Sequence, residues 1–202
     1  MNGLAYQDDR AEVHQMVVGP LDTNVYVLRC RHTGAAALID AADEPALLLE
    51  TCEAFGVAQV LETHGHWDHV QAVPALRAAG YPVFISPADA TMISGHDGLL
   101  EDDAVIKVGV LALHAMATPG HTPGSTCLRL AGSPLLFAGD TLFPGGPGAT
   151  GGDTERFTTI LDSIERRLFT LDLDTVVLPG HGAPTTIGAE RPQLAQWRER
   201  GW

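Results

Sequence analysis

Short apolar runs separated by turn residues dominate the first forty positions of the chain. Val13–Val18, Asn24–Arg29 and Ala35–Asp40 are rich in β-branched and aliphatic residues, which favour strands. The breaks between them are short and contain Gly, Pro, Asp and Thr. The pattern therefore predicts three strands joined by hairpins into an antiparallel meander.

Helical patterns then alternate with further short strands. A helix is expected from Pro45 to about Phe55, with Asp43 as its cap and Gly56 as its stop, because proline suits the first turn and glycine the end. The other expected strands are Gln59–Thr63, Tyr81–Ile85, Val105–Val108, Val110–Ala117, Ser125–Leu130, Leu135–Ala138 and Thr175–Leu178, and the other expected helices are Val70–Ala79, Ser86–Met92 with Ser86 as cap, Thr154–Leu168 and Glu190–Arg200.

Two segments have no regular period. Ser94–Asp103 is polar and turn-like, and Leu142–Asp153 is rich in glycine, so both are expected to be loops and candidate walls of a pocket, with His96 in the first. No shift of composition divides the chain. The pattern predicts one domain over residues 1–202, of class α/β (α+β): two mixed β-sheets packed together with helices outside, an αββα sandwich.

The charge balance excludes some partners. Arginine and lysine number 12 against 25 aspartates and glutamates, for a formal net charge of −13, and Lys107 is the one lysine. With no basic patch, we expect neither nucleic acid nor an anionic membrane surface as a partner, but a small-molecule substrate. The acidity itself is attributed to solubility. The oligomeric state, monomer or homodimer, stays open.

The cysteines and the N-terminal segment bear on location. Cys30, Cys52 and Cys127 are widely spaced and odd in number, so free buried thiols are expected rather than a disulfide framework. No apolar signal segment and no run long enough to span a membrane is visible. We therefore expect a cytoplasmic protein.

Thr63–His69 carries the strongest chemical signal. It reads Thr-His-Gly-His-Trp-Asp-His and lies between an expected strand and an expected helix. Ligand sites of open α/β sheets lie at such strand ends, and imidazole and carboxylate ligands suit zinc or a similar transition metal. His64 and His66 can turn the same way from an extended segment, and Asp68 and His69 can face a neighbouring position. One segment can thus begin two adjacent metal sites.

Three later turns resemble the first. His121 and His181 each follow Pro-Gly after a strand, and Asp140 ends a strand after Gly139. We expect all four segments at one edge of the sandwich. Together they supply five histidines and two aspartates, enough for two metal ions that share a bridging carboxylate.

These motifs resemble those of the metallo-β-lactamase superfamily, and within it the glyoxalase II-like hydrolases. The similarity runs from about Val13 to His181, through His64-x-His66-x-Asp68-His69, Thr118–Gly124 and Gly139–Phe143. The resemblance implies an αββα fold and two divalent metal ions, zinc first, with iron or manganese as alternatives. It implies His64, His66 and His121 as ligands of the first metal, Asp68, His69 and His181 as ligands of the second, and Asp140 as the bridge.

The resemblance also implies a mechanism. A zinc ion lowers the pKa of bound water to about 7, so a hydroxide held by the two metals is available at neutral pH. It would attack the carbonyl carbon of a small ester or thioester while one metal polarises the carbonyl oxygen. Asp68 is the expected catalytic residue, which orients the nucleophile or takes its proton.

The ligand set favours some substrates of the superfamily over others. A β-lactam is disfavoured, because secreted zinc β-lactamases usually lack an aspartate at the position of Asp140, whereas lactonases share all seven ligands. Authentic glyoxalase II has a C-terminal helical extension for glutathione, and the chain ends about twenty residues after His181, which favours another thiol. Persulfide dioxygenases give a second hypothesis, with one iron held by His64, His121 and Asp140.

Other residues receive less specific expectations. Asp40, at a strand end, is expected either to hydrogen-bond to a ligand histidine or to act as an ordinary cap. We expect Trp67 to pack within the motif, and Trp197 and Trp202 to pack on the body or on a partner chain. His14, His32 and His114 are expected to be ordinary surface or core residues.

Overall fold

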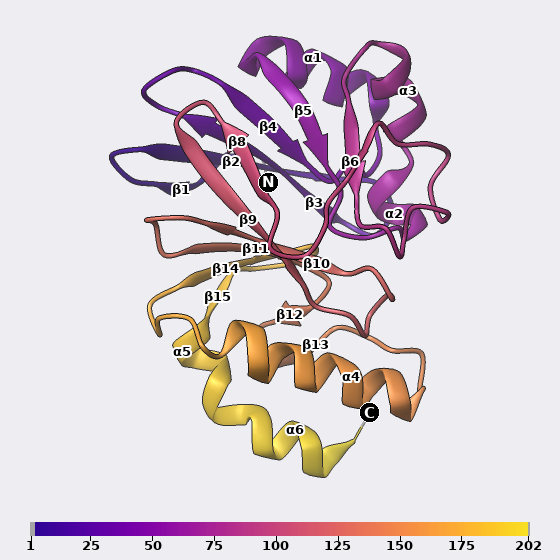
Figure 1. Ribbon diagram of the computed structural model, residues 1–202, viewed down its shortest axis with the longest axis vertical. Helices are drawn as coiled ribbons and strands as arrows, with labels where there is room; N and C mark the ends of the chain where they lie inside the picture. The colour runs from indigo at the N-terminus through magenta and orange to yellow at the C-terminus, as the bar shows by residue number, and fades with distance from the viewer. Residues whose placement is uncertain (1–2, 202) are drawn as a thin grey trace.

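Two mixed β-sheets face each other, with helices on both outer faces, in the computed structural model, which describes residues 3–201 (Figure 1). The first sheet has the order β1-β2-β3-β4-β5-β6-β7 and the second the order β15-β14-β11-β10-β9-β8. Helices α1 to α3 cover the first sheet, and α4 to α6 cover the second. This is the predicted αββα sandwich.

The elements have the following bounds. The first sheet contains β1 (Gly3–Gln7), β2 (Ala11–Val18), β3 (Thr23–Cys30), β4 (Ala36–Ile39), β5 (Val57–Leu61), β6 (Val83–Ile85) and β7 (Gly98–Leu99). The second contains β8 (Val105–Val108), β9 (Leu111–Ala117), β10 (Thr126–Leu130), β11 (Leu135–Gly139), β14 (Val176–Pro179) and β15 (Thr185–Thr186), and β12 (Leu142–Phe143) pairs with β13 (Gly146–Pro147). The helices are α1 (Pro45–Phe55), α2 (Trp67–Val70), α3 (Val73–Ala78), α4 (Thr154–Ser163), η1 (Ile164–Leu168), α5 (Ile187–Glu190), η2 (Arg191–Gln193) and α6 (Leu194–Arg200).

The hydrophobic core forms three layers, because successive strand residues point to opposite faces of a sheet. In β3, Leu28 faces the space between the sheets, while Val27 faces α1 and α3. In β10, Leu128 lies in the central layer and Cys127 under α4. Burial on both faces explains why the strands read as apolar runs rather than as strict alternation.

The meander and the first helix largely match expectation. Strands β2, β3 and β4 pair antiparallel in sequence order, Pro45 begins α1, and Gly56 ends it in the left-handed conformation at φ 65°. The predicted cap is wrong. Glu44 occupies the cap position without a side-chain cap bond, because the Asp43 carboxylate accepts a hydrogen bond from the backbone N–H of Glu44 at 2.6 Å instead.

Two predicted helices differ in the structure. The segment Val70–Ala79 divides into α2 and α3, because the backbone N–H groups of Gln71 and Ala72 donate to Ala42 and Ala41 rather than to their own helix. The segment Ser86–Met92 forms turns, so the predicted helix and its Ser86 cap are wrong. The carboxylate of Asp89 binds neighbouring loops there, which a regular helix would not allow.

The remaining differences concern short elements. The expected loop at 94–103 contains β7, the glycine-rich loop contains the β12–β13 pair, and β1 and β15 were not expected. The helix expected at 154–168 ends in a π-helical turn, and the terminal helix is divided into α5, η2 and α6. Strands of two residues are too short to show a period. Within residues 3–201, the helices are all too short or too polar to cross a bilayer.

Candidate metal centre

Strand direction brings the four predicted turns to one edge. Strands β9, β11 and β14 run the same way, since β10 is antiparallel to both β9 and β11 and β14 is parallel to β11. Their ends carry His121, Asp140 and His181. His64 follows β5 in the facing sheet, and the ring centroids of His64 and His121 lie 4.8 Å apart. All seven predicted residues therefore converge.

One cluster consists of His64, His66 and His121. A nitrogen atom from each imidazole lies within 4.8 Å of the others, and the rings meet edge to face. Nε2 of His64 and Nε2 of His121 are buried without a hydrogen-bond partner. These nitrogen atoms lie close enough together to bind one cation.

A second cluster consists of Asp68, His69 and His181. Nε2 of His181 lies 3.2 Å from Oδ2 of Asp68 and 3.3 Å from Nε2 of His69. His69 is fully buried, whereas His181 is partly exposed. The donor atoms again lie within 4.8 Å of one another.

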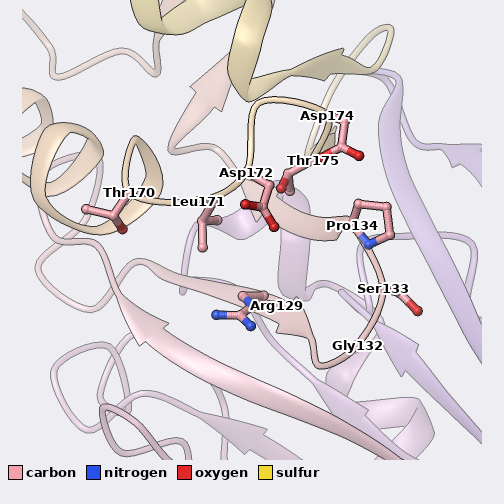
Figure 2. Close-up of a pocket in the computed structure, with 9 residues that line it drawn as sticks. All are labelled: Arg129, Gly132, Ser133, Pro134, Thr170, Leu171, Asp172, Asp174 and Thr175. Carbon is pink, nitrogen blue, oxygen red and sulfur yellow. The ribbon is translucent and has the colours of Figure 1, made fainter.

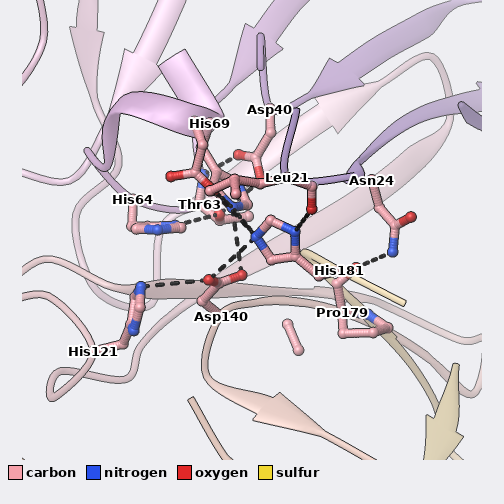
Figure 3. Close-up of polar contacts among 12 residues, drawn as sticks. Leu21, Asn24, Asp40, Thr63, His64, His69, His121, Asp140, Pro179 and His181 are labelled. Carbon is pink, nitrogen blue, oxygen red and sulfur yellow. Dashed lines mark hydrogen bonds and ion pairs between the residues drawn. The ribbon is translucent and has the colours of Figure 1, made fainter. Parts of the chain in front are cut away.

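Asp140 lies between the two clusters. Its Oδ2 is 3.5 Å from Nε2 of His121 and 3.6 Å from Nε2 of His181, and its Oδ1 is 3.4 Å from Nε2 of His69. Figure 3 shows His121 and His181 reaching the carboxylate from different sides. This is the position expected of a carboxylate that bridges two cations.

The donor set fits transition-metal ions. A buried polar atom without a partner costs free energy, and His64 Nε2, His121 Nε2 and Asp140 Oδ1 all face the same site. Imidazole nitrogen and carboxylate oxygen are ligands of zinc, iron and manganese. A Cβ at Gly180 would lie 2.1 Å from Oδ1 of Asp140, so only glycine leaves the carboxylate room. That all seven side chains bind metal stays a prediction.

The electrostatics favour a cation. Burial lowers the pKa of His64, His66 and His121, so these imidazoles are neutral and free to coordinate. At Asp140 burial alone would raise the pKa, but hydrogen bonds from His181 and His69 outweigh it and hold the pKa well below the ordinary value.

In the second cluster the shift is in the opposite direction, because the pKa values of both its histidines, His69 and His181, are raised. Burial opposes a charge on His181, yet hydrogen bonds to Asp140 and Asp68 raise its pKa to about 10. Asp68 keeps a lowered pKa, because the hydrogen bond from His181 outweighs its own burial. The negative charges of Asp68 and Asp140 that stabilise this proton also favour a metal cation, which would displace the proton from His181 on binding.

Hydrogen bonds behind the clusters orient the imidazoles. Nδ1 of His69 lies 2.8 Å from Oδ2 of Asp40, which also accepts from Thr63 Oγ1 at 2.8 Å. The expectation that Asp40 contacts a ligand histidine is confirmed. Nδ1 of His121 faces the carbonyl of Ala149 at 2.7 Å, and Nδ1 of His181 faces that of Leu21 at 3.0 Å. Each pairing leaves the opposite ring nitrogen pointing into the site.

The glycine-rich segment Leu142–Asp153 also contacts the candidate ligands. Besides the Ala149 carbonyl, it places Phe143 against His181, with nearly parallel rings and centroids 6.4 Å apart. The side chain of Arg156 donates to the carbonyls of Gly120 and His121 and so holds the His121 turn in place.

Asp89 was missed by the sequence analysis, which placed it in a helix. Its carboxylate is fully buried and accepts from the backbone N–H groups of Gly65 at 2.9 Å and Gly124 at 2.7 Å, and from Thr122 Oγ1 at 2.6 Å. It therefore ties the His64–His66 turn to the His121 turn. No local sequence signal distinguishes Asp89 from an ordinary turn aspartate.

Asn24 and Tyr26 were also missed. The amide of Asn24 donates to the carbonyls of Pro179 and Gly182, and the hydroxyl of Tyr26 donates to Pro179 at 2.7 Å. Both side chains come from β3 of the first sheet and hold the His181 turn of the second. Figure 3 shows Asn24 beside Pro179. Contacts of this kind depend on sheet packing and have no sequence motif.

The expectations for the tryptophans and for His96 have different outcomes. Trp67 is 55% exposed, so the expectation that it packs is wrong: it begins α2, and its neighbours Asp68 and His69 take the inward positions. Trp197 is buried beside Phe169 and packs on the body. Trp202 lies outside the described residues. In the described part of the chain, His96 joins none of the ligand clusters.

A separate hollow of about 380 Å³ lies at the opposite end of the second sheet (Figure 2). Pro134 and Thr175, which precede β11 and β14, line it together with Arg129 and Asp172. The candidate ligands follow those same strands. This hollow is therefore not part of the candidate metal centre.

Comparison with known sequences agrees with this geometry. The family model of the metallo-beta-lactamase superfamily matches residues 18–181. The probable metallo-hydrolase YqgX of Bacillus subtilis is 32% identical over 203 residues, covering 89% of this chain and 94% of that protein. A hydroxyacylglutathione hydrolase of Rhodospirillum rubrum is 33% identical over 84% of this chain, which spans 66% of that enzyme.

Solved structures have the same fold. BLEG-1 B3 metallo-beta-lactamase superposes with a TM-score of 0.79 at 30% identity, covering 89% of this chain and 96% of that one. ETHE1 from Myxococcus xanthus gives 0.78 at 27% identity, covering 91% and 84%. TTHA1623 in a di-iron-bound form gives 0.72 at 30% identity, covering 88% and 96%. The chain belongs to the metallo-beta-lactamase superfamily and is a metal-dependent hydrolase.

Proposed function

We propose that the chain hydrolyses a small ester or thioester at a site for two divalent metal ions. His64, His66 and His121 would hold one ion, and Asp68, His69 and His181 the other. The observation that carries this proposal is the place of Asp140, whose carboxylate lies 3.4–3.6 Å from histidine nitrogens of both clusters. The di-iron form of TTHA1623 supports a dinuclear site.

The side chains divide the work of the reaction. When bound, the two cations supply a water molecule acidic enough to act as a nucleophile near neutral pH, and they polarise a carbonyl oxygen. Asp68 lies beside the site with its oxygen 3.2 Å from His181, and its lowered pKa keeps it charged. It can orient a water molecule and accept its proton. Asp40 keeps His69 in one orientation through a 2.8 Å contact.

The substrate class follows from the relatives and from the site. The Rhodospirillum relative is named a hydroxyacylglutathione hydrolase, which supports a thioester. We propose an acyl ester of a small thiol as the substrate. A lactone is the nearest alternative ester. The free buried cysteines support a reducing compartment, the cytoplasm.

A second candidate function is oxygenation of a persulfide at a single iron ion. The structural similarity to ETHE1 favours it, and His64, His121 and Asp140 would hold that iron. The intact cluster of Asp68, His69 and His181 favours the hydrolase, because a single iron would leave those three side chains without a cation.

Metal analysis combined with a substrate panel tests the proposal. We expect about two metal ions per chain by mass spectrometry, and hydrolysis of acyl thioesters faster than that of a lactone or a β-lactam. One iron per chain with oxygen uptake on a persulfide would establish the second candidate instead. Faster hydrolysis of the β-lactam than of the thioesters would overturn the proposed substrate class but not the two-metal hydrolytic site.

A further inference from the structure

An open groove of about 510 Å³ borders the metal centre at His66. Its apolar lining consists of Trp67, Val70, Pro74, Met92 and Ile93. Trp67 is 55% exposed and Met92 is 42% exposed. Large apolar side chains gathered on a surface typically mark a binding site. This groove therefore needs an occupant that explains its apolar lining.

The groove is built onto the turn that carries the candidate ligands. His66 belongs both to the groove and to the first histidine cluster. A Cβ on Gly65 would lie 2.6 Å from the Cβ of Met92, so the two segments are in close contact. Asp89 fixes that contact through its hydrogen bond to Gly65. A molecule in the groove would extend directly from the metal centre.

The lining selects for an uncharged group. Its polar members are His66, Gln71 and Ser94, and it contains no aspartate, glutamate, lysine or arginine. Common thiol carriers bear carboxylates or phosphates, which this surface would not pair. An aliphatic chain would instead remove Trp67 and Met92 from water, which is favourable in proportion to the area covered.

We infer that this groove binds the acyl chain of the substrate, and that the enzyme prefers thioesters of aliphatic acids of intermediate length. The inference rests on the proposed function and names the substrate class for that site. Trp67 and Met92 are specificity-determining residues. They contact the acyl chain, while the carbonyl carbon lies at the metal centre.

A chain-length series tests the inference with the metal-loaded protein. The substrates are N-acetylcysteamine thioesters of acetate, butyrate, hexanoate and octanoate, which share one neutral thiol. We expect kcat/KM to rise about twofold for each added methylene, since complete burial would give roughly fourfold and the groove is open on one side. Met92→Gln should flatten the series. Leu173→Gln is the matched control, because Leu173 is 56% exposed and precedes β14, far along that strand from His181.

A binding measurement separates the groove from the chemistry. The amide analogue of the octanoyl substrate is used in the metal-free protein, where it cannot be turned over, and its binding should change the tryptophan fluorescence of the protein. The change should disappear in Trp67→Phe, because Trp67 is exposed whereas Trp197 is buried.

Each result decides one question. Thioester hydrolysis with no dependence on acyl length, and no fluorescence change from Trp67, would overturn the groove and leave the proposed function standing. Dependence on the length of the thiol rather than the acid would overturn the acyl assignment. No hydrolysis of any thioester would overturn the proposed function, and the fluorescence titration would still decide whether the groove binds an aliphatic chain.

Discussion

The carboxylate of Asp89 accepts a hydrogen bond from the backbone N–H of Gly65 at 2.9 Å. The same side chain accepts from the hydroxyl of Thr122 and from the backbone N–H of Gly124, which follow His121 in its turn. Because Gly65 separates His64 from His66, one buried carboxylate sets the distance between turns that are far apart in the sequence.

Replacing Asp89 by alanine should loosen both turns. The change leaves the buried N–H groups of Gly65 and Gly124 without a partner and removes one of the two hydrogen bonds of the Thr122 hydroxyl, which should lower the free energy of unfolding by roughly 3 kcal/mol. Metal affinity should fall about 10–100-fold, as for other residues that support ligands indirectly. Urea unfolding and titration against a competing chelator measure the two effects. Glu53→Ala, an exposed change on α1, is the control, and equal metal affinity in both variants would contradict the role of Asp89.

Asp140→Asn should separate the two metal positions. The amide keeps the shape of the side chain but removes the negative charge shared by the two clusters. We expect fewer than two ions per chain and a loss of about 10³-fold in kcat/KM. Metal analysis and thioester hydrolysis measure this, with Asp174→Asn at the opposite end of β14 as control. Full activity in Asp140→Asn would exclude the two-metal scheme.

Asp40→Asn should weaken the second metal position while preserving the fold. Asp40 adopts a left-handed backbone conformation at φ 63°, which asparagine tolerates better than other residues. The amide would lose the charged contact to Nδ1 of His69, so affinity for one of two ions should fall about 10–100-fold. Calorimetric metal titration should show one weakened phase. An unchanged titration would mean that Asp40 does not orient His69.

Removal of the metal should lower thermal stability. Ions that bind only the folded chain stabilise it by mass action, about 4 kcal/mol at a concentration 1,000 times the Kd. For a chain of this size that corresponds to roughly 10 °C in Tm. Zinc, iron or manganese should restore the Tm after chelation, whereas magnesium should not, because it prefers oxygen ligands. A Tm unaffected by chelator would contradict a metal centre of this kind.

Two of the three thiols, Cys52 and Cys127, should be unreactive in the folded chain. Both are buried, and burial raises the pKa of Cys52 to about 12 and of Cys127 to about 11. At Cys30 burial also opposes the charge, but hydrogen bonds from Thr33 and Val110 outweigh it and lower the pKa to about 7. A thiol reagent at pH 8 should label neither Cys52 nor Cys127 in the native protein and all three cysteines after unfolding.

The raised thiol pKa values also have a consequence for stability. Cys52 and Cys127 ionise near pH 9 in the unfolded chain but stay protonated there in the folded one. The stability that these two thiols contribute is therefore complete below that pH and falls as pH rises toward 11. Urea unfolding across this range measures the loss. Cys52→Ala should reduce the slope, and an identical slope in that variant would show that Cys52 does not contribute.

Local pattern was sufficient for most of the sandwich. Strands β2, β3 and β4 follow from apolar runs, and the ends of α1 follow from Pro45 and Gly56. These signals depend only on residues that are neighbours in the chain, so the sequence alone predicts them. The helix predicted over Ser86–Met92 failed for the opposite reason. Its decisive interaction is the hydrogen bonding of Asp89 to residues up to 35 positions away.

The sequence by itself determined the ligand types, their place after strands and the layered fold, because these follow from side-chain chemistry and short-range periodicity. Only the tertiary structure decided that Asp140 lies between two histidine clusters, that Asp89 ties two turns together, and that Trp67 faces an open groove. Those relationships depend on the packing of one sheet against another, which joins residues with no local pattern in common.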